Sequence, residues 1–242
     1  MAEKSPGDTS EFYVPENGLE LAPYLATENL TAVHHLARYF WAIRVLARRE
    51  PGVILDVATG AGYGAYLMAK YLPRFTIIGA DYDPRSVEFA RRNYQEHGLT
   101  NLSYCHFDLE EWRVVNGDSQ LGQLDYITSF DTIEHLLHRE IALINLAEFI
   151  APSGMLLLST PSSTATNILN PEWVHHKVEY SYRYLYNLMR RFFKIVDIPD
   201  NGSLPELDYW NDVVNRGTLR YPLRVNPIAC SVPIVFGLGD IG

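Results

Sequence analysis

The chain has 242 residues, 47% of them apolar and 20% charged, a composition that predicts an ordinary globular protein and excludes a disordered or fibrous one. Acidic residues outnumber basic ones by 29 to 20, and a net charge of -9 disfavours nucleic acid as a substrate because phosphates would be repelled. The cysteines, Cys105 and Cys230, lie far apart and predict neither a disulfide framework nor a metal-binding pair. Since we find neither a signal peptide nor a long apolar run, we expect a cytoplasmic protein that does not bind membranes.

The N-terminal part of the chain predicts an arm followed by a helix. Residues 1–20 carry Pro, Gly, Ser and charge without periodicity, and we expect this arm to order only at a partner or an active site. Apolar residues then recur at helical spacing from Glu28 to Arg49, and Pro51-Gly52 ends the helix. We assign residues 1–50 to the arm and a lid helix, and residues 51–242 to the main body of a single domain.

Beyond Pro51, short apolar strands alternate with helices. This alternation predicts an α/β fold with a doubly wound, mostly parallel sheet of seven strands, covered by helices on both faces. The predicted strands are Val53–Val57, Thr76–Ala80, Leu102–His106, Leu124–Phe130, Gly154–Ser159, Lys194–Ile198 and Val232–Phe236. The predicted helices are Ala65–Tyr71, Pro84–His97, Arg139–Ile150 and Tyr180–Phe192.

A glycine-rich turn follows the first predicted strand. Ligands of doubly wound sheets bind at the carboxyl ends of strands, and Gly60 and Gly62 would let backbone N–H groups approach a ligand there. The same glycines fit the G-x-G-x-x-A fingerprint of dinucleotide enzymes, with Asp81 about 20 residues further on. Asp56, ahead of the glycines, would repel a pyrophosphate, whereas it can accept hydrogen bonds from an amino group. A cofactor with an amino-acid tail is therefore favoured over a dinucleotide.

Five segments in order resemble the motifs of class I S-adenosylmethionine (SAM)-dependent methyltransferases. The resemblance implies a Rossmann-like fold and SAM as the cofactor. Its segments are Val53–Gly62, Ile78–Asp83, Phe107–Leu109, Leu124–Leu136, and Ala151–Gly154 together with Leu158–Pro161.

The same resemblance implies which residues bind the cofactor. Asp81 would accept hydrogen bonds from both ribose hydroxyls, Tyr82 would lie against the adenine, and Asp108 would meet the adenine amino group. Ala58 replaces the first glycine of the usual motif, so we expect a slightly altered turn there. The full predicted set is Asp56, Ala58, Thr59, Gly60, Gly62, Asp81, Tyr82, Asp108, Leu109 and Phe130.

The catalytic residues for methyl transfer are predicted in the segment after the fourth strand, Asp131–His135. Methyl transfer to oxygen or nitrogen benefits from a base, and a histidine has a pKa suited to work near neutrality. Our hypothesis is that His135 is the general base and that Glu134 orients it or the substrate. The alternative interpretation is that His135 only packs and forms hydrogen bonds on this segment.

A second segment, His176–Tyr180, resembles the H-x-x-E-[YW] pattern found after the fifth strand in several methyltransferase families, and it makes His176 a third catalytic candidate. These families include metal-dependent small-RNA terminal 2′-O-methyltransferases and some ubiquinone-pathway O-methyltransferases. The resemblance implies an Mg²⁺ or Mn²⁺ site in which an aspartate replaces a usual glutamate. The implied ligands are Asp131, Glu134, His135 and His176.

The predicted lid helix contains an H-x-x-R-Y pattern, His35–Tyr39, which resembles methyltransferases often thought to act on sugars, glycans or secondary metabolites. Arg38 is expected to pair with a carboxylate, that of SAM included, or else to be a surface residue beside a core tyrosine. We therefore predict O-methylation of a small polyhydroxylated molecule, closest to the ubiquinone-pathway-like group, and a homodimer is left open. The alternatives are a metal-dependent 2′-O-methyltransferase on RNA ends and a non-catalytic SAM-binding scaffold.

Overall fold

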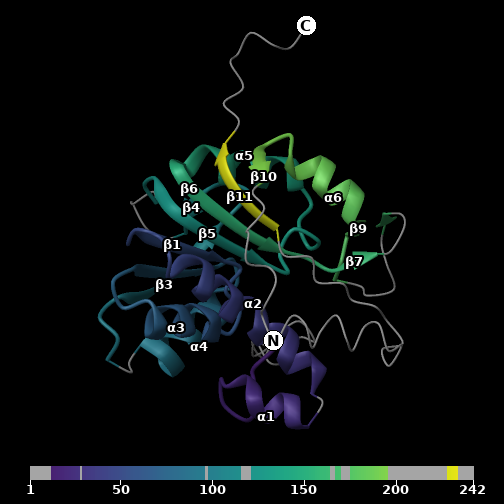
Figure 1. Ribbon diagram of the computed structural model, residues 1–242. Helices are drawn as coiled ribbons and strands as arrows, with labels where there is room; N and C mark the ends of the chain where they lie inside the picture. Colours follow the sequence, from purple (N-terminus) through teal and green to yellow (C-terminus); the bar gives the residue numbers. More distant parts are fainter. Residues whose placement is uncertain are drawn as a thin grey trace, which may run out of the picture.

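The computed structural model describes residues 12–27, 29–95, 98–115, 121–163, 167–169, 175–195 and 228–233 (Figure 1). Most of the predicted N-terminal arm lies outside the described residues. So do the ends of three predicted elements, at His97, Ile198 and Phe236, and most of the chain that follows Ile195.

The central sheet has the order β10-β11-β6-β5-β1-β2-β3-β4 (Figure 1). β1 pairs in parallel with both β2 and β5, and β3 and β6 extend the parallel part on either side. β11 lies antiparallel between β6 and β10, so β10 runs in the same direction as β6. The doubly wound, mostly parallel sheet is therefore confirmed. Its strands are β1 (Val53–Val57), β2 (Thr76–Asp81), β3 (Leu102–Asp108), β4 (Arg113–Val114), β5 (Leu124–Phe130), β6 (Ile150–Ser159), β10 (Phe193–Ile195) and β11 (Ile228–Pro233).

In the described part of the chain, the sheet has eight strands, one more than the predicted seven. The additional strand is β4, two residues that turn back and pair antiparallel with the end of β3. A second sheet, which the sequence did not predict, has the order β7-β9-β8. Because Val178–Ser181 pairs there as β9, the last helix starts at Tyr182 rather than at Tyr180. The other strands of this small sheet are β7 (Ser162–Ser163) and β8 (Ile168–Leu169).

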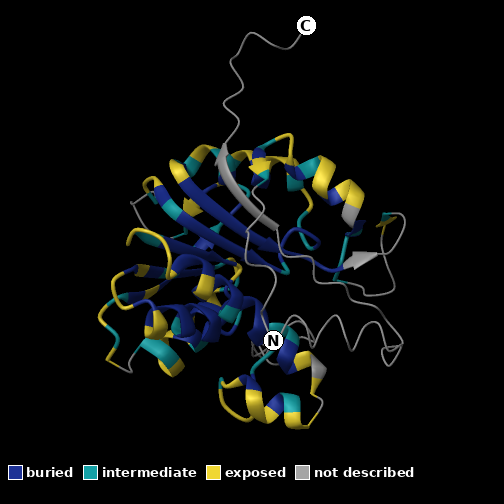
Figure 2. Cartoon of the chain, viewed as in Figure 1, coloured by how far each residue is buried: buried dark blue, intermediate teal, exposed yellow. Residues whose placement is uncertain are grey.

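Helices cover both faces of the central sheet, and Figure 2 shows buried strands between helices whose outer sides are exposed. Two apolar clusters fill the two interfaces. The first joins α1 (Leu21–Ala26), α2 (Leu30–Leu46), α3 (Tyr63–Tyr71) and α4 (Pro84–Tyr94) to the sheet, and the second joins α5 (Arg139–Phe149) and α6 (Tyr182–Met189) to its other face. Within the described part of the chain, no helix combines the length and the apolar character that crossing a membrane requires.

The predicted lid helix, α2, is part of the core. The Asn29 side chain caps it by accepting a hydrogen bond from the backbone N–H of Ala32 at 3.1 Å, which explains why the helix starts there. Leu36, Tyr39 and Trp41 are all buried in the first apolar cluster. Because this packing fixes α2 against the sheet, its polar residues are held at a constant position beside the carboxyl ends of the strands.

Gly64, in the first turn of α3, allows α2 and α3 to approach closely. A Cβ atom at this position would overlap the ring of Tyr39. That ring is buried and also lies edge-on to Tyr63 and to Phe130, so these neighbours restrict its movement away from α3.

We expect Gly64→Ala to lower the free energy of unfolding by about 1–3 kcal/mol, because the added methyl group overpacks the contact with Tyr39. Urea denaturation measures this change. Gly122→Ala is the matched control, since a Cβ at that exposed glycine meets no atom within 4 Å. Equal unfolding midpoints for the two variants would contradict the assigned packing.

Candidate functional site

The carboxylate of Asp56 is the most strongly held polar group at the carboxyl edge of the sheet. It is fully buried, and three hydroxyl groups donate hydrogen bonds to it. Thr128 donates to Oδ1 at 2.6 Å, Thr59 to Oδ2 at 2.6 Å, and Tyr39 to Oδ2 at 3.3 Å. Burial raises the pKa of Asp56 to about 6, and the three hydroxyl donors oppose the shift. This carboxylate therefore joins α2, the glycine-rich turn and β5.

The turn after β1 uses left-handed backbone at three residues, Ala58 (φ 53°), Gly60 (φ 56°) and Gly62 (φ 85°). Ala58 thus adopts the conformation that favours glycine, at a cost of roughly 1–2 kcal/mol. A Cβ on Gly62 would overlap Ala90, whereas a Cβ on Gly60 would meet nothing within 4 Å. Gly62 is therefore required for packing, and Gly60 faces open space.

Asp81, the last residue of β2, is fixed by backbone N–H groups. Gly60 donates to its Oδ2 at 2.8 Å and Asp83 donates to its Oδ1 at 2.9 Å. Burial raises the pKa of Asp81 to about 6, although both N–H donors oppose the shift. Tyr82 follows with 69% of its surface exposed, and its ring centroid lies 6.1 Å from that of His106. An acceptor and an exposed aromatic ring thus stand side by side next to the glycine-rich turn.

The remaining predicted cofactor residues lie at the same edge of the sheet. Asp108 ends β3, and its Oδ1 accepts the backbone N–H groups of Glu110 at 2.9 Å and Glu111 at 3.0 Å. Leu109 and Phe130 are buried, and Phe130 is the last residue of β5. Because β1, β2 and β3 are parallel neighbours, their terminal carboxylates line one edge of the sheet.

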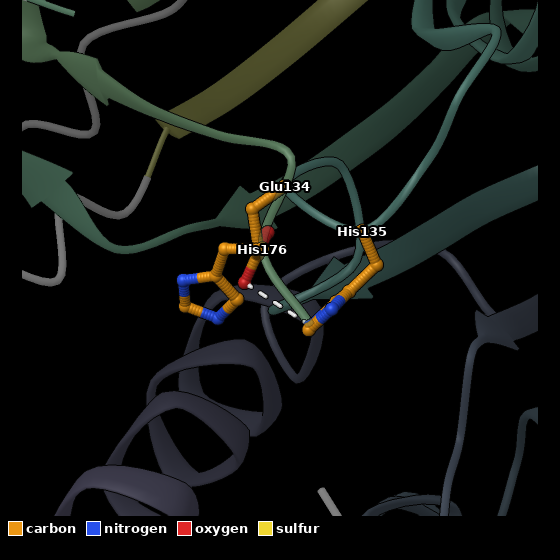
Figure 3. Close-up of side chains that lie close together, drawn as sticks. All are labelled: Glu134, His135 and His176. Atoms are coloured by element: carbon orange, nitrogen blue, oxygen red, sulfur yellow. Dashed lines mark ion pairs between the residues drawn. The ribbon is translucent and has the colours of Figure 1, made fainter. Parts of the chain in front are cut away.

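The three predicted catalytic residues lie together (Figure 3). Ligand atoms of Glu134, His135 and His176 all lie within 4.8 Å of one another. Glu134 is fully buried, and its Oε2 accepts a hydrogen bond from the Thr160 hydroxyl at 2.7 Å. Its Oε1 has no hydrogen-bond partner in the described part of the protein and lies 3.8 Å from Nε2 of His135. Burial and, next, the negative charge of Asp131 raise the pKa of Glu134 well above its usual value.

Hydrogen bonds orient both imidazole rings. Nδ1 of His135 lies 3.2 Å from the backbone oxygen of His175, and a carbonyl only accepts, so Nδ1 of His135 carries the proton. Nε2 of a neutral His135 then presents a lone pair toward Glu134. In the same way, Nδ1 of His176 lies 2.8 Å from Oε1 of Glu179. The rings of His135 and His176 meet edge to face, with centroids 4.9 Å apart.

Backbone pairing explains how His176 reaches this group from a distant part of the sequence. The backbone N–H of Lys177 donates to the carbonyl oxygen of Glu134 at 2.7 Å. This bond and the contact between His135 and His175 attach the segment before β9 to the turn after β5.

Asp131 does not join the group of Glu134, His135 and His176, which corrects the expected set of four metal ligands. Its Oδ2 instead forms an ion pair with Nη1 of Arg38 at 2.5 Å. Burial would raise the pKa of Asp131, but the guanidinium of Arg38 outweighs burial and lowers it. Arg38 is only 5% exposed and also contacts Nδ1 of His35 at 3.0 Å, so it pairs with a carboxylate and is not a surface residue.

The sequence motifs that contain three further residues of the site predicted no role for them. Tyr39, Thr128 and Thr160 act by donating hydroxyl groups to carboxylates that lie on other elements. Which hydroxyl meets which carboxylate depends on strand pairing, and a single sequence does not contain that information. Glu179 is the glutamate of the H-x-x-E-[YW] pattern, and its role could have been predicted because a carboxylate commonly orients a functional imidazole.

Comparison with known proteins shows which family the chain belongs to. Residues 50–199, more than half of the chain, match a family described as a methyltransferase domain. A probable S-adenosylmethionine-dependent methyltransferase of Mycolicibacterium smegmatis is 28% identical over 149 residues, which are 62% of this chain and 52% of that protein. A ubiquinone biosynthesis O-methyltransferase of Cereibacter sphaeroides is 26% identical over 125 residues, 50% of this chain and 47% of that protein. The chain therefore spans about half the length of the curated relatives it matches.

Solved structures share the fold. The O-methyltransferase from a trans-AT PKS multienzyme of Brevibacillus brevis, in complex with S-adenosylhomocysteine, aligns with a TM-score of 0.56 and 12% identity over 92% of this chain and 82% of that one. The [4+2]-cyclase SpnF aligns with a TM-score of 0.61 and 15% identity over 82% of this chain and 81% of that one. Together with the family match and the ordered motifs, these likenesses lead to one conclusion: the chain belongs to the class I SAM-dependent methyltransferases.

Proposed function

We propose that this chain methylates a hydroxyl oxygen of a small molecule, with SAM as the methyl donor. The observation that carries the proposal is the group of Glu134, His135 and His176, which stands at the same edge of the sheet as the glycine-rich turn and Asp81. Methyl transfer is an in-line displacement, so a site needs a nucleophile held in line with the methyl group. The similarity to the Cereibacter protein, which is named as an O-methyltransferase, supports oxygen as the acceptor atom.

His135 serves as the general base in this proposal. Its Nδ1 faces the carbonyl of His175, and in this proposal its Nε2 takes the acceptor's hydroxyl proton while the oxygen gains the methyl group of SAM and S-adenosylhomocysteine leaves. The positive charge that forms on His135 opposes the raised pKa of Glu134, whose oxygen lies 3.8 Å from Nε2, and the ionised carboxylate then stabilises the imidazolium. His176, held by Glu179, orients the acceptor from the opposite side.

The cofactor residues keep the roles predicted for them. In this proposal Asp81 accepts the ribose hydroxyls, Tyr82 covers the adenine, and Asp108 meets its amino group. Arg38 lies near the methionine end, where the carboxylate of SAM would compete with Asp131 for its guanidinium. The others, Asp56, Ala58, Thr59, Gly60, Gly62, Leu109 and Phe130, form the turn and the walls.

A divalent metal ion is a second candidate component, favoured by one specific observation. Ligand atoms of Glu134, His135 and His176 lie within 4.8 Å of one another, and such a donor set fits Mn²⁺ or Mg²⁺. Oε1 of Glu134 is buried and has no hydrogen-bond partner among the residues that the structure describes. A bound ion would lower the pKa of the acceptor hydroxyl. The net charge of -9 favours a small acceptor over RNA ends.

We expect SAM to bind about tenfold more weakly at pH 5 than at pH 7, because Asp81, with its pKa raised to about 6, becomes protonated and loses an acceptor for the ribose. Calorimetric titration across this range measures the effect. Asp81→Asn should bind SAM weakly throughout and show a smaller pH dependence, and the remainder is assigned to Asp56, whose pKa is also raised to about 6. A wild-type affinity that does not change between about pH 5 and pH 7 would contradict this role of Asp81.

Loss of the proposed base should lower turnover and leave cofactor binding intact. Polyhydroxylated small molecules are first screened with labelled SAM, and turnover is then compared for His135→Ala and wild type. We expect kcat to fall about a hundredfold or more, with an unchanged Kd for SAM. His138→Ala, which removes an exposed imidazole three residues further on, is the control. If wild type and His135→Ala turn over at the same rate across pH, His135 is not the general base. If wild type itself shows no turnover with any acceptor but binds SAM, the scaffold alternative is favoured.

Metal dependence is tested on the same preparation. Protein treated with a chelator and titrated with Mn²⁺ should bind the ion and regain activity, and His176→Ala should bind it at least about tenfold more weakly. Full activity of chelated protein that contains no bound metal would exclude a catalytic role for the metal, and His135 alone would then activate the acceptor.

A further inference from the structure

The hydroxyl of Thr160 contacts Glu134 from the neighbouring strand. Thr160 follows β6 directly, and Glu134 lies in the turn after β5, so the pairing of these two strands brings them together. Both side chains are 0% exposed, and the Thr160 hydroxyl donates to Oε2 of Glu134 at 2.7 Å. Because water does not reach this contact, the hydroxyl replaces solvent as the partner of that oxygen.

The contact decides where the second oxygen of Glu134 points. The backbone of Glu134 is already fixed, since its carbonyl accepts the N–H of Lys177 at 2.7 Å. With Oε2 held by Thr160, the planar carboxyl group directs Oε1 toward the imidazoles, 3.8 Å from Nε2 of His135. Oε1 has no hydrogen-bond partner in the described part of the chain. This atom is therefore free to act on whatever occupies the space between Glu134, His135 and His176.

We infer that Thr160 is a positioning residue, whose hydroxyl holds Glu134 in the orientation that the site uses. The inference rests on the proposed function, because it concerns the working arrangement of that same group. It is distinct from a packing role, since packing depends on the shape of the side chain and positioning depends on its hydroxyl.

Substitutions at Thr160 separate these two roles. Thr160→Val keeps the shape and removes the hydroxyl, whereas Thr160→Ser keeps the hydroxyl and removes a methyl group. Thr132→Val is the matched control, because Thr132 is buried in the same turn but its hydroxyl donates to the backbone oxygen of Phe130 at 3.3 Å. If Thr160→Val does not fold, Thr160→Ala is a second variant without the hydroxyl.

The readouts are Mn²⁺ affinity by electron paramagnetic resonance, SAM affinity by calorimetry, and a crystal structure of Thr160→Val. We expect Mn²⁺ affinity to fall about tenfold or more in Thr160→Val and to stay within about threefold of wild type in Thr160→Ser and Thr132→Val. SAM affinity should not change, and the crystal structure should show Oε1 of Glu134 turned away from His135.

Failure of this inference can be told apart from failure of the proposed function. Equal Mn²⁺ affinities for wild type and Thr160→Val would overturn the inference and leave the metal site intact. An equally large loss in Thr160→Ser would also overturn it, because packing alone would explain the effect. If wild type binds no Mn²⁺, the metal candidate fails, and the crystal structure of Thr160→Val decides: an unmoved Glu134 carboxyl group overturns the inference, and a rotated one supports it.

Discussion

The buried carboxylate of Asp56 is the constraint on which the arrangement of the site depends. An ionised carboxyl group without water is costly unless donors surround it, and here three hydroxyl groups do so. Each donor comes from a different element: Tyr39 from α2, Thr59 from the glycine-rich turn, and Thr128 from β5. Satisfying one buried charge therefore fixes the relative positions of the N-terminal helix, the turn and the strand that leads to Glu134 and His135.

The position of α2 determines the electrostatics of the neighbouring group. Arg38 lies one residue before Tyr39, so the helix that Asp56 fixes also brings a guanidinium to Asp131. This ion pair neutralises Asp131 through its Oδ2, while its Oδ1 is buried without a hydrogen-bond partner among the described residues. Among the described residues, no arginine or lysine forms an ion pair with Glu134, whose Oε2 instead accepts a hydrogen bond from the neutral hydroxyl of Thr160. The two carboxylates, three residues apart in sequence, thus have different environments, and only Glu134 has an oxygen turned to the imidazoles.

The sequence predicted the parts of the fold that depend on local pattern. Alternating apolar strands and helices placed β1 and β5 at their observed ends, and the ordered motifs indicated the family. The short strands β4, β7 and β8 were missed, because two-residue strands leave no periodicity to recognise. Asp131 was misplaced as a metal ligand for a different reason. Its partner, Arg38, is 93 residues earlier in the chain, and only the tertiary packing of α2 brings the two together.

The central claim is that cofactor and base meet at the edge of the sheet fixed by Asp56. A crystal structure of the protein with S-adenosylhomocysteine tests this claim most directly. We predict the ribose hydroxyls on Asp81, the homocysteine end between the glycine-rich turn and Arg38, and the sulfur atom facing the space beside His135 and Glu134. A complex in which the ribose lies away from Asp81, or in which the sulfur points away from His135, would contradict it.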